Sequence, residues 1–289
     1  MARTLRLGGQ TFAPGELAVM AIVNRTPDSF FDRGATFAEE SALRAVERAV
    51  AEGARIIDIG GVKAGPGAEV DVAEEIRRTV RTIASVRAEF PEVVISIDTW
   101  RAEVATEAVA AGADLLNDTW AGADPALAEV AAATGAGLVC SHAGGLTPRT
   151  RPHRAAFADV VADVVTKVTG LAERAVALGV RPDGILIDPA HDFGKNTRHS
   201  LEITRRLAEL TETGWPVLVA LSNKDFVGET LDLPVEQRLD GTLAATAVSA
   251  WLGARIFRAH QVAPTRRVLD MVASIRGDRP PAVSRRALA

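Results

Sequence analysis

The stretch LAVMAIVN (17–24) is a continuous apolar run that ends in a polar residue, and a segment with helical periodicity follows it. The same pattern recurs seven times, at RIIDIGG (55–61), VVISIDT (93–99), DLLND (114–118), GLVCSH (137–142), GILIDP (184–189), PVLVALSNK (216–224) and RIFRAH (255–260). Strands that are covered on both faces have continuous apolar runs of this kind. Eight such strands with helices between them predict an α/β fold, a single (β/α)8 TIM barrel.

The segments between the runs have apolar residues at i, i+3 and i+4, which is typical of amphipathic helices. They cover residues 38–52, 73–89, 102–111, 125–133, 155–179, 199–213, 235–253 and 263–275. Glycines that follow helix ends are expected to be left-handed caps, and here these are Gly53, Gly112, Gly135, Gly179, Gly214 and Gly253. Repeated helix ends of this kind support the βα unit more strongly than any single strand does.

The two ends of the chain are expected to lie outside the repeated unit. TLRLGGQTF (4–12) has two short alternating pieces around Gly8 and Gly9, which predicts a short N-terminal β-hairpin that could close one end of the barrel. Residues 277–289 combine two prolines with basic residues and are expected to form a flexible C-terminal tail. Residues 1–276 would then form the barrel domain.

The composition is that of an ordinary globular protein. The 289 residues are 47% hydrophobic and 24% charged, with a formal net charge of −4. This balance gives no reason to expect nucleic acid as a partner, and no run approaches the roughly 20 apolar residues that span a membrane. The single cysteine, Cys140, lies in an apolar run and is expected to be an inert core thiol. A lone thiol fits a reducing compartment, so a cytoplasmic location is expected.

The polar ends of the apolar runs are the candidate site residues, because the active site of a (β/α)8 barrel lies at the carboxyl ends of its strands. Those ends are Asn24, Asp58, Asp98, Asn117, His142, Asp188, Lys224 and the pair Arg258 and His260. An aspartate in such a place can instead cap the next helix, and for Asp98 a helix that starts near Arg101 is the alternative. Lys224 and Arg258 cannot accept a hydrogen bond from a helix N–H group, so capping does not explain them.

The mixture of polar groups suggests a ligand with two chemical halves. One group offers carboxylates and an amide, which suit the N–H-rich edge of a heterocycle: Asp58, Asp98, Asn117 and Asp188. The other offers donors and positive charge, which suit a phosphate-type anion: Asn24, Lys224, Arg258 and His260. A Mg²⁺ ion held by substrate phosphates would need one protein oxygen, which Asn24 could supply. The sequence has no P-loop, no Gly-x-Gly-x-x-Gly fingerprint and no zinc-ligand spacing.

These residues and their neighbours resemble the dihydropteroate synthase family. NRTPDSFFDRG (24–34) resembles the family's Asn-x-Thr-Pro-Asp-Ser-Phe-x-Asp-Gly signature after the first strand. Later signatures follow in order, at SIDTW (96–100), LLND (115–118), LIDP (186–189), FGK (193–195), SNKDF (222–226) and FRAH (257–260). The resemblance extends from about Ala18 to Leu269, which is nearly the whole chain.

The resemblance implies a transferase of folate biosynthesis, which joins a dihydropterin methyl pyrophosphate to p-aminobenzoate and releases pyrophosphate with the help of Mg²⁺. It implies that the pterin is bound by Asp98, Asn117, Asp188 and Lys224. The pyrophosphate would be bound by Asn24, Arg258 and His260, with Asn24 also a magnesium ligand, and the catalytic residues would be Lys224, Asp188 and Arg258. The family usually forms homodimers through late barrel helices, and Trp251 in an apolar helical segment is compatible with that and equally with a tryptophan of the core.

The chain departs from the family in the loops that would hold the second substrate. In DIGGVKAGPG (58–67) the segment Val62, Lys63, Ala64 and Gly65 replaces the family's Glu-Ser-Thr-Arg. Asn223 replaces the arginine of a Ser-Arg-Lys triplet, and DPAHDFGK (188–195) replaces the glycine-rich DPGIGFGK. The candidate residues of an altered second-substrate loop are therefore Lys63, Pro66 and Asn223.

Three interpretations remain open at this point. The first is a synthase-type transferase whose activity is reduced or altered, and the second is a catalytically inactive pterin-binding or regulatory homologue. The third is a pterin-using methyltransferase on a similar barrel, which no residue specifically favours. The loop HAGGLTPRTRPHR (142–154) adds Arg149, Arg151 and Arg154, which with Lys63 could form a basic rim for an acidic co-substrate. The alternative is a solvated loop whose arginines serve solubility.

Overall fold

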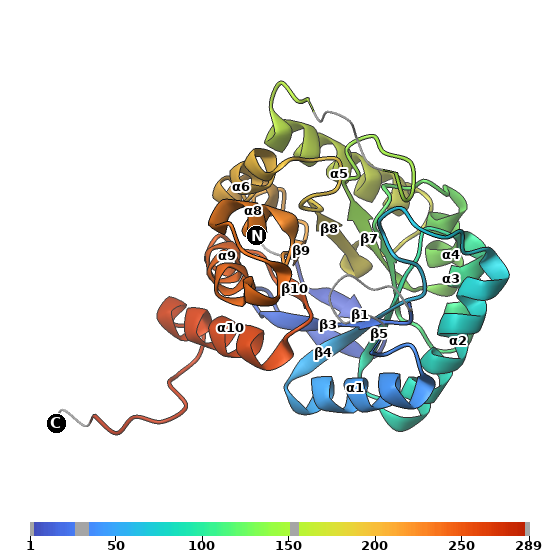
Figure 1. Cartoon of the computed structure of the whole chain (residues 1–289), viewed down its shortest axis with the longest axis horizontal. Coiled ribbons are helices and arrows are strands. Elements are labelled where there is room, and N and C mark those ends of the chain that lie inside the picture. Colours follow the sequence, from blue (N-terminus) through green and yellow to red (C-terminus); the bar gives the residue numbers. More distant parts are fainter. Residues whose placement is uncertain (1–2, 27–34, 151–155, 287–289) are drawn as a thin grey trace.

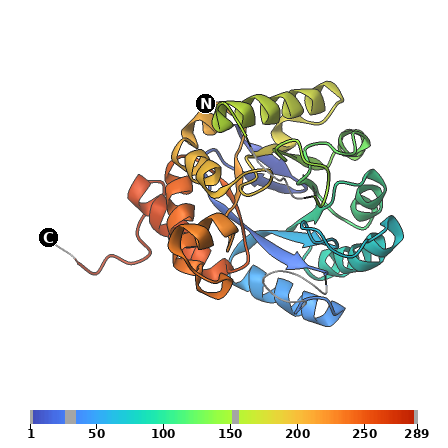
Figure 2. The ribbon, with the colours of Figure 1, turned by 45° about the horizontal axis from the view of Figure 1, so that its top comes forward.

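The described residues form a barrel of eight parallel strands surrounded by helices (Figures 1 and 2). The computed structural model describes residues 3–26, 35–150 and 156–286. The barrel strands are β3 (Ala18–Asn24), β4 (Ala54–Gly60), β5 (Val94–Asp98), β6 (Leu115–Asp118), β7 (Gly137–Ser141), β8 (Ile185–Asp188), β9 (Leu218–Ala220) and β10 (Ile256–Ala259). They lie in the order β8-β7-β6-β5-β4-β3-β10-β9. The ring closes between β8 and β9, where the N–H of Ile187 donates to the carbonyl of Pro216 at 3.0 Å. The predicted (β/α)8 barrel is confirmed.

The helices cover the outside of the barrel. In the described part of the chain they are α1 (Glu39–Ala51), α2 (Val72–Glu89), α3 (Ala102–Ala110), α4 (Ala126–Thr134), α5 (Val160–Ala177), α6 (Thr197–Arg205), α7 (Ala208–Thr211), α8 (Asp225–Leu231), α9 (Leu239–Trp251) and α10 (Val262–Arg276). Short 3₁₀ turns lie at Pro182–Gly184 and Val235–Gln237. The predicted segment 199–213 is divided into α6 and α7, and α8 was not predicted because seven residues carry too little periodicity.

Six glycines end helices as predicted. Their φ angles lie between 76° and 115°, in the left-handed region that a side chain rarely adopts: Gly53, Gly112, Gly135, Gly179, Gly214 and Gly253. Each of them turns the chain from an outer helix back toward the next strand.

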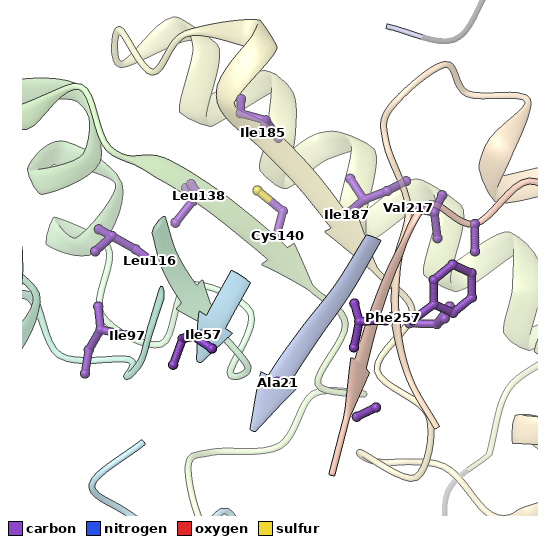
Figure 3. Packing of buried hydrophobic residues seen from close by; sticks show 14 of the residues in the cluster. Ala21, Ile57, Ile97, Leu116, Leu138, Cys140, Ile185, Ile187, Val217 and Phe257 are labelled. Carbon is purple, nitrogen blue, oxygen red and sulfur yellow. The ribbon is translucent and has the colours of Figure 1, made fainter. Parts of the chain in front are cut away.

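Two apolar cores fill the molecule. The inner core lies inside the barrel, where the antiparallel hairpin of β1 (Leu5–Leu7) and β2 (Gln10–Phe12) meets the inward side chains of the strands. Leu5, Leu7 and Phe12 have no exposed surface, so the predicted hairpin is confirmed and fills the N-terminal end of the barrel. The outer core lies between strands and helices, as Figure 3 shows for Ile57, Ile97 and Cys140. Burial raises the pKa of the Cys140 thiol to about 12, which makes it unreactive.

Strand alternation decides which polar side chains point into the barrel. Successive side chains of a strand point to opposite faces, so residues two apart share a face. Apolar residues of the inner core are followed two positions later by a polar residue in six strands: Ile56 and Asp58, Val94 and Ser96, Leu115 and Asn117, Val139 and Ser141, Leu186 and Asp188, and Ile256 and Arg258. A polar layer therefore lies above the inner core, at the carboxyl ends of the strands.

The chain leaves the barrel after α10. That helix ends at Arg276, where Gly277 has a φ of 81°. Residues 277–286 contain no helix or strand and extend away from the barrel in Figure 1. The expected boundary at residue 276 coincides with this helix end. None of the helices in residues 3–26, 35–150 and 156–286 is long and apolar enough to cross a membrane.

Candidate functional site

Arg258 lies at the centre of the inward-facing polar layer. Its Nε donates to Oδ2 of Asp58 at 2.6 Å, and its Nη2 donates to Oδ2 of Asp98 at 2.8 Å. Burial alone would lower the pKa of Arg258, but the two carboxylates outweigh it and the pKa is raised. The guanidinium of β10 is thus fixed against carboxylates of β4 and β5.

Asp58 is buried and accepts hydrogen bonds from neighbouring side chains of the polar layer. Its Oδ1 accepts hydrogen bonds from Oγ of Ser96 at 2.6 Å and from Nδ2 of Asn117 at 3.3 Å. Its side chain has no exposed surface. A ligand would therefore contact Arg258 and Asn117, which Asp58 orients, rather than Asp58 itself.

Asp98 is the accessible carboxylate of this group. Its side chain is 24% exposed, and its Oδ1 accepts a hydrogen bond from Oγ1 of Thr119 at 2.7 Å. Burial raises the pKa of Asp98 to about 6, against the opposing effect of Arg258. The helix-capping alternative for Asp98 is wrong, because the N–H of Arg101 donates to Thr99 instead.

Asn24 and Asp98 flank a notch made by Gly60. Gly60 pairs with Asn24 on one side and with Asp98 on the other in the register of β3, β4 and β5. A Cβ at Gly60 would lie 3.4 Å from Cβ of Asp98 and 3.9 Å from Oδ1 of Asn24. The amide oxygen of Asn24 and the side chain of Asp98 therefore both border the notch at Gly60.

Asp188 and Lys224 form a second charged group on the other side of the barrel. Oδ1 of Asp188 accepts a hydrogen bond from the N–H of Ala190 at 2.7 Å. Burial raises the pKa of Asp188, and Lys224 opposes that rise. The ammonium of Lys224 donates to the carbonyl of His191 and lies 5.0 Å from the ring centre of Phe193. A carboxylate, an ammonium and an aromatic ring are therefore adjacent here.

His260 differs from its expected character. Its Nδ1 lies 3.0 Å from Oγ of Ser222, and burial, with a smaller effect of Arg258, lowers its pKa to about 3. The expectation that His260 adds positive charge is therefore wrong, since a buried imidazole beside a guanidinium is neutral at neutral pH. It remains a polar group beside Arg258.

A cleft of about 480 Å³ lies beside Lys224, on the side where the second-substrate loops were expected. Trp120 and Phe193 form an edge-to-face pair in its wall, with ring centres 5.3 Å apart. Asp192 also lines the cleft; its carboxylate accepts hydrogen bonds from Oγ of Ser200 at 2.8 Å and from the N–H of Phe226 at 3.1 Å. The cleft therefore combines two aromatic rings with a fixed carboxylate next to a lysine.

The backbone around this cleft is strained. Ala190, Asp192 and Asn223 have φ angles of 48°, 68° and 56°, which non-glycine residues rarely adopt. Such conformations are held by surrounding contacts and cluster at functional sites. Asn223 is fully buried, and its Nδ2 donates to Oε1 of Gln261 at 3.2 Å. Asn223 therefore lines the cleft with a side chain that is fixed by Gln261.

Lys195 fastens the loops that follow β7 and β8. Its Nζ donates to the carbonyls of His142, Ala190 and Phe193 at 2.9, 3.0 and 2.8 Å. Burial lowers its pKa to about 7. All three donors of the ammonium are directed at backbone oxygens, so this lysine is a structural clamp in the wall of the cleft.

The remaining predicted residues are only partly brought into the site. Lys63 is partly buried, Pro66 is exposed, and their neighbours Ala64 and Gly65 line the cleft. His142 is fully buried and its Nε2 contacts Asp163 of α5 at 2.7 Å, so this strand end is directed away from the cleft. Of the proposed basic rim, Arg149 is partly buried, while Arg151 and Arg154 lie outside the described residues.

The site also contains residues that the sequence did not single out. Ser96 could have been found, because it points inward two residues before Asp98. Thr119 follows β6, and no local pattern marked it. Asp192 lies in the loop after β8, within DPAHDFGK (188–195), where the departure from the family motif marked its position but not its role. Their place in the site depends on contacts between strands and loops that are distant in sequence.

Comparison with known proteins gives a consistent result. The family model described as "Pterin binding enzyme" matches residues 20–260. A protein of Mycobacterium leprae named "Inactive dihydropteroate synthase 2" is 60% identical over 98% of this chain and 99% of its own length. The solved dihydropteroate synthase of Yersinia pestis in complex with a sulfonamide drug has a TM-score of 0.90 at 34% identity, covering 96% of this chain and 100% of its own. The Xanthomonas albilineans synthase with 4-aminobenzoic acid has a TM-score of 0.86 at 35% identity, covering 98% and 100%.

These relatives correct one expectation. The sequence resemblance implied an active synthase-type transferase, with Lys224, Asp188 and Arg258 as catalytic residues. The relatives at 60% identity are named as inactive, whereas the two solved synthases above are only 34% and 35% identical. The expected enzymatic activity is therefore contradicted, and the inactive homologue is the better of the interpretations.

Proposed function

We propose that this chain, which belongs to the pterin-binding enzyme family, is a pterin-binding protein that does not carry out the synthase reaction. The observation that carries this proposal is the contrast between the two sides of the site. On one side Arg258, Asp98 and Asn117 are held in a satisfied polar network. On the other, Asp192 sets a negative charge beside Lys224, where an anionic second substrate would need a free cation.

In this proposal the pterin ring is bound by Asp98, Asn117, Asp188 and Lys224. The two carboxylates accept hydrogen bonds from ring N–H groups, and the burial that raises their pKa values also strengthens such bonds. Asn117 is held by Asp58, which leaves its carbonyl oxygen available to a ligand. Lys224 supplies a hydrogen-bond donor from the opposite side of the barrel to Asp98.

The pyrophosphate is proposed to lie against Asn24, Arg258 and His260. Nε and one N–H of Nη2 in Arg258 are used by Asp58 and Asp98, so Nη1 can donate to an anion while both ion pairs persist. No group of three His, Cys, Asp or Glu residues that could hold a metal occurs among the described residues. Mg²⁺ would therefore be bound through the pyrophosphate, with Oδ1 of Asn24 beside the Gly60 notch as its one protein ligand.

We also propose a homodimer formed through α9 and α10. Val248 and Trp251 of α9 are 48% and 59% exposed, and Met271 and Ile275 of α10 are 60% and 59% exposed. Each pair is three or four residues apart and shares one helix face, and the two helices pack against each other. Apolar surface gathered in this way is typical of a contact between subunits. A cytoplasmic location belongs to the same proposal, in keeping with the free thiol of Cys140.

Calorimetry with the dihydropterin pyrophosphate and Mg²⁺, followed by a product assay with p-aminobenzoate, tests the proposed function. We expect binding without product. Asp188→Ala should abolish binding, and Asp183→Ala, at the other end of the barrel, should leave it unchanged. Absence of binding by the unaltered protein would overturn the pterin site, and product formation would overturn the lack of synthase activity.

A further inference from the structure

A second polar cavity lies at the opposite end of the barrel from the pterin site. Its volume is about 220 Å³, and Gly15, Trp215 and Gly253 line it just before β3, β9 and β10 begin. Three arginines, Arg3, Arg255 and Arg276, also line it, and no carboxylate of the described residues does. We call it the arginine cavity.

Arg255 is the innermost of the three arginines. It is 4% exposed, and its Nη atoms donate to the carbonyls of Arg3, Phe12 and Ala13. Its Nε has no acceptor, and no carboxylate lies within ion-pair distance of it, in residues 3–26, 35–150 and 156–286. Burial lowers its pKa, and the electrostatic effect of Glu16 opposes this only in part. A buried charge that lacks a counter-ion is costly, so this position favours an anion.

Glu16 does not neutralise the cavity, because it is already engaged. Its Oε1 lies 2.6 Å from Nη1 of Arg55, and its Oε2 accepts a hydrogen bond from the N–H of Ala13 at 2.9 Å. Both oxygens therefore have partners outside the arginine cavity. Arg255 therefore has no carboxylate paired with it among the described residues.

The other two guanidinium groups lie nearer the opening. Arg3 is stacked on Trp215, with its Cζ 3.8 Å from the ring centre, which fixes the plane of the guanidinium. Nη2 of Arg276 lies 3.6 Å from where a Cβ of Gly15 would be, which places this guanidinium beside the chain at Gly15. Arg276 is paired with Asp278 at 2.9 Å. Within the part of the chain that the structure describes, Asp278 is the one carboxylate that pairs with any of these three guanidinium groups.

We propose that the arginine cavity binds a phosphate-type oxyanion, either inorganic phosphate or the phosphoryl end of a small metabolite. Guanidinium groups offer paired N–H donors that match the oxygens of such an anion. A larger hollow of about 560 Å³ adjoins the cavity and shares Arg3 and Trp215 with it. Glu173 and Asp183 line this hollow. The organic remainder of a bound metabolite is therefore neutral or cationic.

Such an anion would join parts of the chain that are distant in sequence. Arg3 precedes the hairpin, Arg255 precedes β10, and Arg276 ends α10. Binding at their meeting point stabilises the folded protein in proportion to the occupancy. The site is separate from the pterin site and does not depend on the proposed function.

The test is calorimetry and thermal unfolding with inorganic phosphate as the probe, at constant ionic strength against chloride. Arg3→Gln combined with Arg276→Gln should weaken phosphate binding at least about tenfold and remove the thermal stabilisation. Arg279→Gln is the matched control, because Arg279 lies outside the cavity and pairs with Asp270. Ribose 5-phosphate as a second probe distinguishes a metabolite site, which it would occupy more tightly than phosphate, from a site for the free anion.

Phosphate can also occupy the proposed pyrophosphate site, so the location is checked separately. Crystals soaked in phosphate should contain the anion in the arginine cavity, within hydrogen-bond distance of Arg3 or Arg276. Two results would overturn the proposal. One is equal phosphate binding by the double variant and by Arg279→Gln, and the other is an empty arginine cavity in the soaked crystals.

Discussion

Nε of Arg258 donates a hydrogen bond of 2.6 Å to Oδ2 of Asp58, a carboxylate with no exposed surface. The pair joins β10 to β4, and the further contact with Asp98 of β5 at 2.8 Å extends it across the barrel. The same guanidinium that would bind an anion therefore also neutralises the carboxylates below it. Stability and ligand binding are linked at this one side chain.

The first prediction concerns the stability of this ion pair. Arg258→Met leaves Asp58 buried without its partner, so we expect the free energy of unfolding to fall by about 3–5 kcal/mol. Arg279→Met removes a guanidinium that is 40% exposed, and we expect a loss of at most about 1 kcal/mol. Urea unfolding measures both. A loss at position 258 no larger than that at position 279 would contradict the structural role of Arg258.

The second prediction concerns the pH dependence of pterin binding. The pKa of Asp98 is raised to about 6, so Asp98 takes up a proton as the pH falls below 6 and loses its capacity to accept from ring N–H groups. If only the ionised form binds, the affinity falls roughly tenfold between pH 7 and pH 5. Calorimetry across this range measures it.

Two other groups bear on that pH experiment. His260 has a pKa of about 3 and does not titrate in this range, whereas Asp118, with a pKa of about 6, does. Asp118 accepts from the N–H groups of Trp120 and Gly122, outside the proposed pterin contacts. The variant Asp98→Asn therefore distinguishes the titration of Asp98 from that of Asp118. This variant should bind more weakly at pH 7 and lose less affinity between pH 7 and pH 5 than the unaltered protein, with the remaining loss assigned to Asp188, whose pKa burial also raises. An unchanged pH profile would assign the effect to another group.

The third prediction concerns the hairpin at the closed end of the barrel. Leu7 has no exposed surface, and we expect Leu7→Ala to lower the free energy of unfolding by about 2–5 kcal/mol. Thr11 lies on the exposed face of the same hairpin, and Thr11→Ala should change it by no more than about 0.5 kcal/mol. Equal effects in denaturant unfolding would show that the hairpin does not form part of the core.

The fourth prediction concerns the proposed dimer. Trp251→Glu places a charge in the exposed apolar face of α9 and should convert the dimer to a monomer. Leu178→Glu changes an apolar side chain that is 50% exposed beyond the end of α5 and should leave the dimer intact. Analytical ultracentrifugation measures both masses. A monomeric parent protein, or a dimer that persists in Trp251→Glu, would argue against this interface.

The fifth prediction concerns the cleft beside Lys224. Asp192→Asn removes the carboxylate that lies next to the lysine, so binding of 4-aminobenzoate in the presence of the pterin should tighten about tenfold. Asp225→Asn is the matched control, since Asp225 also lines the cleft but is largely exposed and pairs with Arg238. Equal affinities for the two variants would show that Asp192 does not set the charge preference of the cleft.

The barrel and one layer of its site were predictable from local sequence patterns. Both signals depend on residues within a few positions of one another. The continuous apolar runs occur eight times, and the glycines after helices occur six times. Alternation then places Asp58, Asp98 and Asp188 near the carboxyl ends of their strands without further information. The fold and the list of inward polar residues are therefore properties of short segments.

The partners of those residues were decided only by the closed barrel. Arg258 is 200 residues from Asp58 and 160 from Asp98, and no local pattern fixes which of eight strand ends it meets. The neutral state of His260, the carboxylate of Asp192 beside Lys224 and the arginine cavity depend likewise on burial and on charges from several strands. Local sequence specifies which groups are available, whereas their charge and partners depend on distances through space, which strand register and barrel closure set.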